Sequence, residues 1–202
     1  MIIGVLAVQG GVAEHERTLD ALGVAHRQVR RVAHLEGLDG IILPGGESTT
    51  MSKLLTLGGL YEPLKQALAD GLPAYGTCAG MILLAAKVLD TRADAVNFSA
   101  IDVTVRRNAF GRQVDSFEAN LDFAGIEKPV HAVFIRAPWI EETGAGVETL
   151  ATVESGPAAG AVVAVRQGNV LATSFHPEVT GDTEVHEYFL DMVRQHKAGR
   201  ES

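Results

Sequence analysis

The sequence predicts an α/β fold: an open, mostly parallel sheet flanked by helices, with some antiparallel strands in the second half of the chain. Two patterns support this fold class. In the first half, short apolar runs alternate with amphipathic segments, which is typical of β-α-β units whose helices cover both faces of a parallel sheet. In the second half, strand-like segments follow one another with few helices between them, so some of these strands are expected to be antiparallel.

The first half begins with an apolar run at residues 2–8 that is almost free of polar side chains, as expected for a strand buried on both faces. The next segment, residues 13–22, is predicted to be a helix that stops before Gly23. The remaining elements of this half are expected to be strands at residues 25–29, 40–43 and 73–76 and helices at residues 49–57, 60–70 and 79–89.

The second half is expected to contain strands at residues 101–105, 130–135, 150–153, 161–166 and 170–174. Gln167-Gly168-Asn169 is typical of a hairpin turn between the last two of these strands. A final helix is predicted over residues 183–196, with Asp182 as its N-cap. We expect residues 1–197 to form a single domain and residues 198–202 to be a disordered tail.

The composition excludes several classes of protein. The chain has 17 Lys and Arg against 25 Asp and Glu, and a net charge of −8 does not favour binding to nucleic acid. The longest apolar stretch, residues 1–8, is far shorter than the ~20 residues that cross a bilayer. A single cysteine, Cys78, allows neither an internal disulfide nor a cysteine-based zinc cluster, so we expect a reducing, cytoplasmic location.

Cys78 lies in the pattern G-x-C-x-G, between a predicted strand and a predicted helix. This is the thiol form of a nucleophile elbow, a sharp turn that exposes the nucleophile at the carboxyl edge of the sheet. The following helix directs its N-terminal N–H groups at the same point, which favours a thiolate and offers the backbone N–H of Ala79 to an oxyanion. A lone cysteine is more often a small buried apolar residue, but the elbow favours a nucleophile here.

A second motif, His176-Pro177-Glu178, follows the predicted strand at residues 170–174. A thiol nucleophile needs a base, and the base needs a carboxylate that fixes its tautomer. In an extended segment the side chains of His176 and Glu178 would project to the same side, and Pro177 would stiffen that arrangement. Alone the motif could be a surface turn, but together with the elbow it predicts a Cys-His-Glu triad.

A third motif, P-G-G-E-S at residues 44–48, joins a predicted strand to a predicted helix. Glycines there allow close approach of a ligand, and the N–H groups of the turn can bind an oxyanion or a carboxylate. The spacing is not that of a Walker or dinucleotide-binding loop, so nucleotide binding is not expected.

Together these motifs resemble the class I (triad) glutamine amidotransferases, and more closely the glutaminase subunits of pyridoxal 5′-phosphate synthase. The closer resemblance rests on V-Q-G-G-V at residues 8–12, the L-P-G-G-E-S-T-T-M run at 43–51, the R-N-A-F-G-R-Q-V-D-S-F-E run at 107–118 and F-I-R-A-P at 134–138. It covers residues 1–197, and the run at 107–118 is its most specific part.

The resemblance implies that Cys78 is the nucleophile, His176 the general base and acid, and Glu178 the carboxylate that orients it. It also implies backbone stabilisation of the oxyanion near Gly46 and Ala79. Six residues are expected to contact L-glutamine: Gly46, Glu47, Ser48, Arg107, Ile135 and Arg136. An anion and a cation suit the α-ammonium and α-carboxylate groups of glutamine, but the sequence leaves open which arginine pairs with the carboxylate.

The expected reaction is hydrolysis of L-glutamine to L-glutamate and ammonia through a thioester on Cys78, without a metal or an organic cofactor. Because ammonia is largely protonated in neutral water, a partner should receive it under cover. The resemblance implies that this partner is the synthase subunit of pyridoxal 5′-phosphate (vitamin B6) biosynthesis, in a complex of twelve copies of each subunit, and that the glutaminase is poorly active until docked.

Three alternatives remain at this stage: a glutaminase that serves another pathway, a cysteine peptidase or chaperone-like relative, and a non-catalytic module that regulates a synthase. Glu14-His15-Glu16 and His186-Glu187 are interpreted as solvated faces of amphipathic helices rather than metal ligands, because no other Cys or His has ligand spacing.

Overall fold

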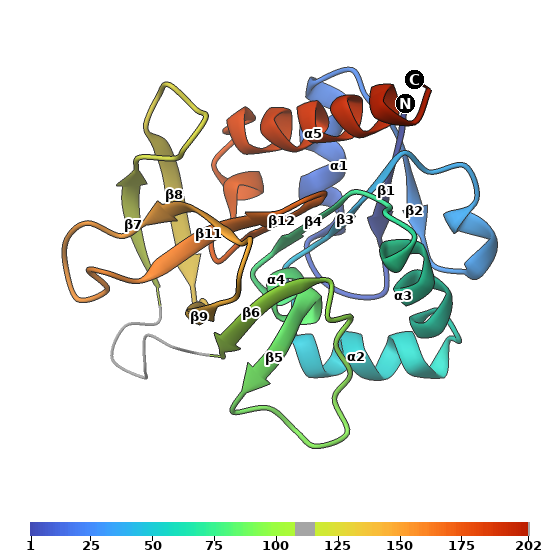
Figure 1. The fold of residues 1–202 in the computed structure, drawn as a ribbon, viewed down its shortest axis with the longest axis horizontal. Coiled ribbons are helices and arrows are strands. Elements are labelled where there is room, and N and C mark those ends of the chain that lie inside the picture. The colour runs from blue at the N-terminus through green and yellow to red at the C-terminus, as the bar shows by residue number, and fades with distance from the viewer. Residues whose placement is uncertain (108–115, 202) are drawn as a thin grey trace.

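A central sheet organises the computed structural model, which describes residues 1–107 and 116–201 (Figure 1). Its strands are β1 (Ile2–Leu6), β2 (Ala25–Val29), β3 (Gly40–Leu43), β4 (Ala74–Thr77), β5 (Ala85–Leu89), β6 (Ile101–Arg106), β9 (Trp139–Thr143), β10 (Glu148–Thr152), β11 (Val162–Gln167) and β12 (Val170–Thr173). Their order is β2-β1-β3-β4-β12-β11-β9-β6-β5, and β10 pairs with β11. The strands from β2 to β12 in that order are parallel, whereas β11 pairs in an antiparallel manner with all of its neighbours, which confirms the predicted fold class.

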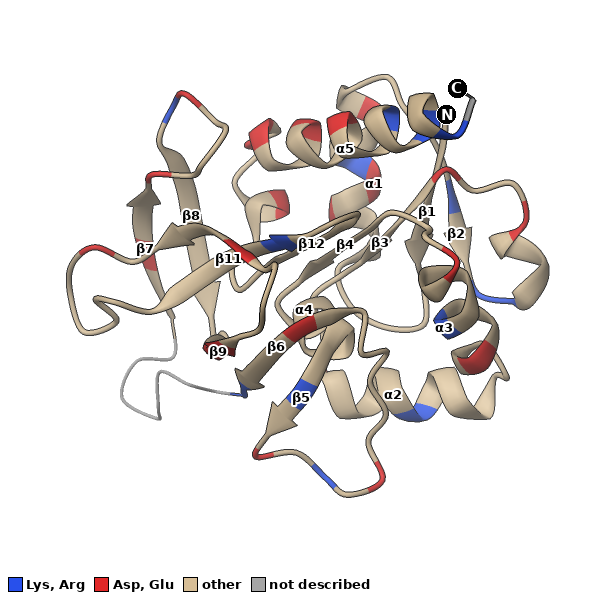
Figure 2. Ribbon diagram, viewed as in Figure 1, with Lys and Arg blue, Asp and Glu red and all other residues tan. Residues whose placement is uncertain are grey.

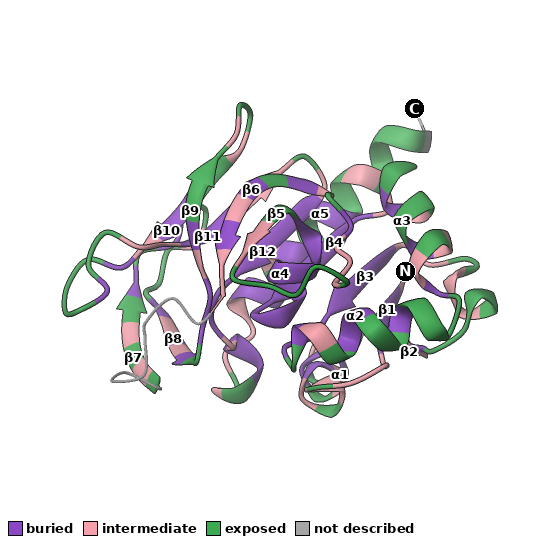
Figure 3. Ribbon diagram, turned by 90° about the horizontal axis from the view of Figure 1, so that it is seen from below, coloured by how far each residue is buried: buried purple, intermediate pink, exposed green. Residues whose placement is uncertain are grey.

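Helices cover both faces of this sheet, and alternate side chains of one strand reach different cores. Ile42 of β3 packs with the core that contains α1 (Val12–Ala21) and α5 (Glu184–Glu201). Its neighbours Ile41 and Leu43 pack with the opposite core, which contains α2 (Ser48–Leu57), α3 (Tyr61–Ala69) and α4 (Ala79–Leu84). Figure 3 shows the central strands as continuously buried, in keeping with their apolar sequences.

Two further strands form a separate hairpin that the sequence predicts only in part. They are β7 (Ser116–Leu121) and β8 (Val130–Ile135), which pair in an antiparallel manner. The strands β7 and β9 were not predicted: β7 (SFEANL) contains Glu, Ala and Asn, which are depleted in strands, and β9 (WIEET) has two adjacent glutamates and no alternation of polar and apolar residues. Of the specific run at 107–118, residues 108–115 lie outside the described part of the chain.

The helix expected over residues 79–89 is wrong in its second half. The helix α4 ends at Leu84, and the chain continues as strand β5. The carbonyl groups of Leu83 and Leu84 accept hydrogen bonds from the N–H groups of Phe98 and Ala100, so the returning chain takes the place of the next helical turn. Pairing with β6 therefore overrides the helical pattern.

Local signals at the turns are confirmed. Gly23 adopts a φ of +67° just after α1, and Gly168 lies in the hairpin turn between β11 and β12. The carboxylate of Asp182 accepts a hydrogen bond of 2.8 Å from the N–H of Glu184 at the start of α5. This helix continues to Glu201, so residues 198–201 are helical where a disordered tail was expected; they contain no proline that would end the helix.

The distribution of charged residues over the structure agrees with the acidic composition of the chain. Figure 2 shows acidic residues along α1 and α5 with basic residues scattered among them, and no basic stripe in this view. Within the part of the chain that the structure describes, no helix is long and apolar enough to span a membrane.

Candidate active site

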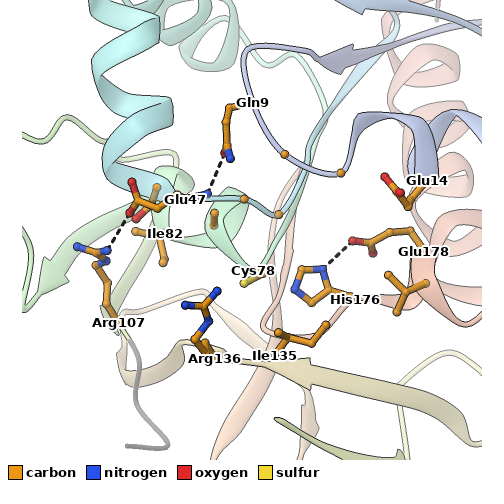
Figure 4. A pocket seen from close by; sticks show the side chains of 17 residues that line it. Gln9, Glu14, Glu47, Cys78, Ile82, Arg107, Ile135, Arg136, His176 and Glu178 are labelled. Carbon is orange, nitrogen blue, oxygen red and sulfur yellow. Dashed lines mark hydrogen bonds and ion pairs between the residues drawn. The ribbon is translucent and has the colours of Figure 1, made fainter. Parts of the chain in front are cut away.

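Four loops meet at the carboxyl edge of the sheet, because β1, β3, β4 and β12 are parallel neighbours. The loop after β1 carries Gln9, the loop after β3 carries Gly45, β4 is followed directly by Cys78, and β12 leads to His176. Figure 4 shows these segments converging on one cavity. Parallel strands thus bring together residues that lie far apart in the sequence, at the edge where α/β sheets bind ligands.

Cys78 occupies the elbow between β4 and α4 in a backbone conformation that few L-residues adopt, with φ +49° and ψ −105°. Its N–H donates a hydrogen bond of 2.8 Å to the carbonyl of Thr173 at the end of β12, which holds the strained turn in place. A Cβ atom on Gly80 would overlap the backbone carbonyl of Leu43, so only glycine lets α4 approach β3 this closely. The predicted sharp turn between strand and helix is therefore present, with Cys78 almost fully buried at its apex.

His176 and Glu178 lie beside this elbow. The Nδ1 atom of His176 is 2.8 Å from Oε1 of Glu178. The two residues are not on an extended segment as predicted, because Pro177–Val179 forms a turn of 3₁₀ helix (η2) that brings the carboxylate back under the imidazole ring. The backbone N–H of His176 donates to the carbonyl of Val133 in β8, which fixes the start of this turn.

The imidazole of His176 is stabilised in its protonated form. Burial lowers its pKa, but hydrogen bonds and charge from Cys78 and Glu178 outweigh burial and raise the pKa to about 10. The Glu178 side chain is only 2% exposed, and although burial raises its pKa, electrostatic interactions with His15 and His176 and the hydrogen bond from His176 lower it below the usual range. The pair can therefore hold an imidazolium and a carboxylate together beside Cys78.

The cavity at this edge has a volume of about 780 Å³. All ten residues that the sequence analysis assigned to the site line it, namely Gly46, Glu47, Ser48, Cys78, Ala79, Arg107, Ile135, Arg136, His176 and Glu178. Seven further lining residues were not assigned to the site: Gln9, Gly10, Gly11, Glu14, Gly45, Ile82 and Val179. The first three of these belong to the V-Q-G-G-V motif, whose two adjacent glycines are a signal of close backbone approach that could have placed it at the site.

The Gly45-Gly46 turn is held by the loop after β1. The carbonyl of Gly45 accepts a hydrogen bond from the N–H of Gly11, and the side-chain carbonyl of Gln9 accepts one of 2.9 Å from the N–H of Glu47. A Cβ atom on Gly45 would overlap the imidazole of His176 and lie 3.4 Å from Cβ of Cys78. This turn therefore packs directly against both triad residues, with Gly46 exposed at the cavity.

Glu47, the N-cap of α2, contributes a negative charge to the cavity wall, which Glu14 and Glu178 also line. Its carboxylate accepts hydrogen bonds from the backbone N–H and hydroxyl groups of Thr49 and Thr50. Burial raises the pKa of Glu47, but these hydrogen bonds outweigh it and lower the pKa to about 2. Oε1 of Glu47 lies 3.2 Å from Arg107, whereas Arg136, with a φ of +43°, makes no ion pair with any described residue.

The prediction that His15 and His186 lie on solvated helix faces is wrong. His15 of α1 and His186 of α5 are both 0% exposed, and Nδ1 of His15 lies 2.9 Å from Nε2 of His186. Both helices turn these residues toward the sheet, beneath the triad, because α1 and α5 pack on the same face. No group of three or more possible metal ligands occurs among the described residues.

Comparison with known proteins agrees with this geometry. The SNO glutamine amidotransferase family matches residues 5–195. The PdxT protein of pyridoxal 5′-phosphate synthase from Corynebacterium jeikeium (strain K411) is 65% identical over 195 residues, which are 96% of this chain and 98% of that protein. PdxT of Nocardia farcinica (strain IFM 10152) is also 65% identical, over 95% of this chain and 85% of that protein.

Among solved structures, the crystal structure of a glutamine amidotransferase is similar with a TM-score of 0.88 and 44% sequence identity, covering 96% of this chain and 99% of that one. The structure of PurLQS from Thermotoga maritima shares only the fold, with a TM-score of 0.64 and 15% identity over 94% of this chain and 97% of that one. With a family match over nearly the whole chain and relatives at 65% identity, the chain belongs to the SNO glutamine amidotransferase family.

Proposed function

We propose that this chain is the glutaminase component of a pyridoxal 5′-phosphate synthase. It hydrolyses L-glutamine to L-glutamate and ammonia, and it delivers the ammonia to the synthase subunit. The observation that carries the proposal is the convergence of Cys78, His176 and Glu178 on one cavity. The wall of this cavity also holds a fixed anion and a guanidinium group that has no ion-pair partner among the described residues. The relatives named PdxT support the choice of pathway.

The two charged α groups of the substrate are held by side chains of opposite charge. The carboxylate of Glu47 suits the α-ammonium group of glutamine, since its lowered pKa keeps it ionised at neutral pH. The α-carboxylate pairs with Arg136, because this guanidinium has no competing carboxylate among the described residues, whereas Arg107 is already bound to Glu47. The backbone at Ser48 and Ile135 completes the contacts around the substrate.

The first half of the reaction forms a thioester. The Cys78 thiolate attacks the side-chain amide carbon, and the backbone N–H groups of Gly46 and Ala79 stabilise the tetrahedral oxyanion, where loss of one such donor typically costs about 3–4 kcal/mol of barrier. His176, which holds the proton in the resting pair, transfers it to the amide nitrogen. The C–N bond then breaks, ammonia leaves, and a γ-glutamyl thioester remains on Cys78.

The second half releases glutamate. His176, now neutral, takes a proton from a water molecule that attacks the thioester carbon, and the thiolate of Cys78 leaves. Glu178 keeps its charge throughout and holds Nδ1–H of His176, so that Nε2 faces the reacting atoms. No step in this sequence requires a metal or an organic cofactor.

The assembly and location are part of the same proposal. We infer that the chain acts as one glutaminase domain and reaches full activity only when docked with the synthase subunit, in a complex that holds twelve copies of each chain. A cytoplasmic location follows from the single free thiol, which needs a reducing compartment to stay a nucleophile.

The test is glutamate release from L-glutamine by the purified chain, with and without the synthase subunit. An activity that rises with the partner and is lost in both Cys78→Ala and Cys78→Ser supports the proposal. The serine variant is the matched control, because it keeps the size of the side chain and removes only the strong nucleophile. Absence of glutamate release under both conditions would reject the proposal.

A further inference from the structure

A row of buried polar groups runs from the triad into the core, and the steps of glutamine hydrolysis do not use it. Nε2 of His15 lies 3.6 Å from Oε1 of Glu178 and 3.2 Å from the hydroxyl of Thr77, the residue before the nucleophile. On its other side, Nδ1 of His15 is 2.9 Å from Nε2 of His186. These residues come from α1, β4, η2 and α5, so four elements meet along this row.

Both histidines are neutral at physiological pH. Each is 0% exposed, and Tyr75 lies edge-on to both rings, at 6.4 Å from His15 and 5.7 Å from His186. Burial lowers the pKa of both residues, that of His186 to about 3. The ionisable groups that face the pair are Glu178, His176, Glu14 and Tyr75; the attraction of Glu178 does not outweigh burial.

One pair of tautomers of His15 and His186 fits the hydrogen bonds of this row. His186 carries its proton on Nε2 and donates it to Nδ1 of His15, which leaves Nδ1 of His186 as a bare lone pair; that atom is buried and has no hydrogen-bond partner among the described residues. His15 then carries its own proton on Nε2 and donates it to the Thr77 hydroxyl at 3.2 Å, and the same nitrogen lies 3.6 Å from Oε1 of Glu178, an electrostatic contact longer than a hydrogen bond.

The opposite pair of tautomers is less favourable for both histidines. With the proton of His15 on Nδ1, His186 would have to carry its proton on Nδ1, which would bury an N–H group without a partner among the described residues; such donors are rarer in proteins than unpaired acceptors. The Nε2 lone pair of His15, even with the Thr77 hydroxyl as donor, would face the negative charge of Glu178 at 3.6 Å.

We propose that His15 is a positioning residue for glutamine hydrolysis, whose neutral Nε2–H holds the Glu178 carboxylate in place, and that His186 fixes the tautomer of His15 that makes this possible. This inference rests on the proposed glutaminase function. A neutral donor stabilises the Glu178 anion without a full positive charge that would compete with the His176 imidazolium for it. It also ties the carboxylate to Thr77, and so to the elbow that carries Cys78.

The tautomers can be read directly by ¹⁵N NMR of the histidine-labelled wild-type chain at pH 7. We expect neutral rings with the proton on Nε2 for both His15 and His186. A proton on Nδ1 of His15, or a charged His15, would overturn the inference. This measurement needs neither a variant nor an active enzyme, so it is independent of the proposed function.

Kinetics test the positioning role in the complex with the synthase subunit. His15→Leu removes the donor, and kcat for glutamate release should fall about 10-fold to 100-fold, the factor expected when a buried carboxylate loses a polar neighbour, with KM within about 2-fold. His15→Gln places an amide N–H near the position of Nε2 and should restore kcat to within about 3-fold of the wild type. His34→Leu, a histidine outside the cavity, serves as the matched control.

The outcomes separate the two proposals. If the wild-type complex releases no glutamate, the proposed function fails. If the wild type is active and a folded His15→Leu variant retains full kcat, only the positioning role fails. Where His15→Leu unfolds, as judged by its melting temperature, the rescue by His15→Gln and the NMR tautomers decide.

Discussion

Nδ1 of His176 lies 2.8 Å from Oε1 of Glu178, although the rigid ring of Pro177 stands between them in the chain. The 3₁₀ turn that begins at Pro177 makes this contact possible, because it folds the carboxylate back toward the imidazole. The contact leaves Nε2 as the nitrogen that can exchange a proton with Cys78. In the proposed mechanism, this short turn thereby determines which nitrogen of His176 exchanges the proton.

Glu178→Gln should therefore lower kcat/KM by about 10³–10⁴-fold, as the equivalent change does in other triads. The amide keeps the size of the side chain, but its NH₂ group can donate to Nδ1 and favour the tautomer with the proton on Nε2. That tautomer cannot accept a proton from a thiol or from water. Steady-state glutamate release by the complex measures the effect.

Glu118→Gln is the matched control for this change, because Oε2 of Glu118 contacts Nε2 of His131 at 2.9 Å on the exposed β7-β8 hairpin. It alters a histidine–carboxylate pair outside the cavity and should leave kcat/KM within about 2-fold. Equal losses in the two variants would contradict the specific role of Glu178.

The protonation of His176 should depend on Cys78. Burial lowers the pKa of His176, but Cys78 and Glu178 together raise it to about 10, so the ring should stay protonated at about pH 8 in the wild-type chain. Because the folded pKa is raised above 6.5, the stability gained from this proton is complete below pH 6.5 and is lost as the pH rises through about 10. Titration of the His176 Cε1–H resonance measures the pKa.

In Cys78→Ala the same resonance should titrate at a lower pH, because the hydrogen bond and charge of the sulfur are gone. Glu178 remains in this variant, so the change isolates the contribution of Cys78. An unchanged titration midpoint would show that the thiol does not interact with His176.

His186 should make the fold sensitive to acid. Its pKa is lowered by burial from 6.5 to about 3, so between these pH values the unfolded chain binds one more proton than the folded chain, and stability falls as the pH falls. The slope contributed by this group is at most about 1.4 kcal/mol per pH unit. His186→Gln keeps a donor at the Nε2 position without a titrating ring, so its urea midpoint should vary less with pH between about 6.5 and 4; identical slopes in both proteins would refute this origin.

The difference between what sequence could and could not predict follows from the range of the interactions. The turn at Cys78 was predicted from five consecutive residues, because the G-x-C-x-G pattern is itself the signal, even though Gly80 relieves a clash with Leu43 of the neighbouring strand β3. The partnership of His15 and His186 depends on packing between helices that are 171 residues apart, and nothing in either helix alone reveals it. For the same reason the end of α4 was missed, since its last carbonyl groups bond to the returning chain rather than to a local signal.

Gly45→Ala should abolish catalysis while leaving the fold intact. The added methyl group would overlap the imidazole of His176. Either this ring or the Gly45-Gly46 turn beside it must therefore move. We expect a loss of kcat of at least about 10²-fold, since a displacement of about 1 Å at a reacting group has this effect. Gly199→Ala in α5, where an added Cβ atom would meet no described atom within 4 Å outside its own stretch of helix, is the matched control and should gain about 0.5–1 kcal/mol of stability with no change in kcat.

Arg136 and Arg107 should differ in how their loss affects substrate binding. Arg136 makes no ion pair with a described residue, so its guanidinium is available for the α-carboxylate of glutamine, and Arg136→Gln should raise KM about 10-fold to 100-fold while kcat changes less. Arg107→Gln removes the partner of Glu47, which keeps its hydrogen bonds from Thr49 and Thr50, so KM should rise less than in Arg136→Gln. Arg194→Gln, which breaks an exposed ion pair with Asp191 on α5, controls for the loss of one positive charge. A larger rise in KM for Arg107→Gln than for Arg136→Gln would assign the α-carboxylate to Arg107 instead, because the two variants remove the same charge from the same cavity.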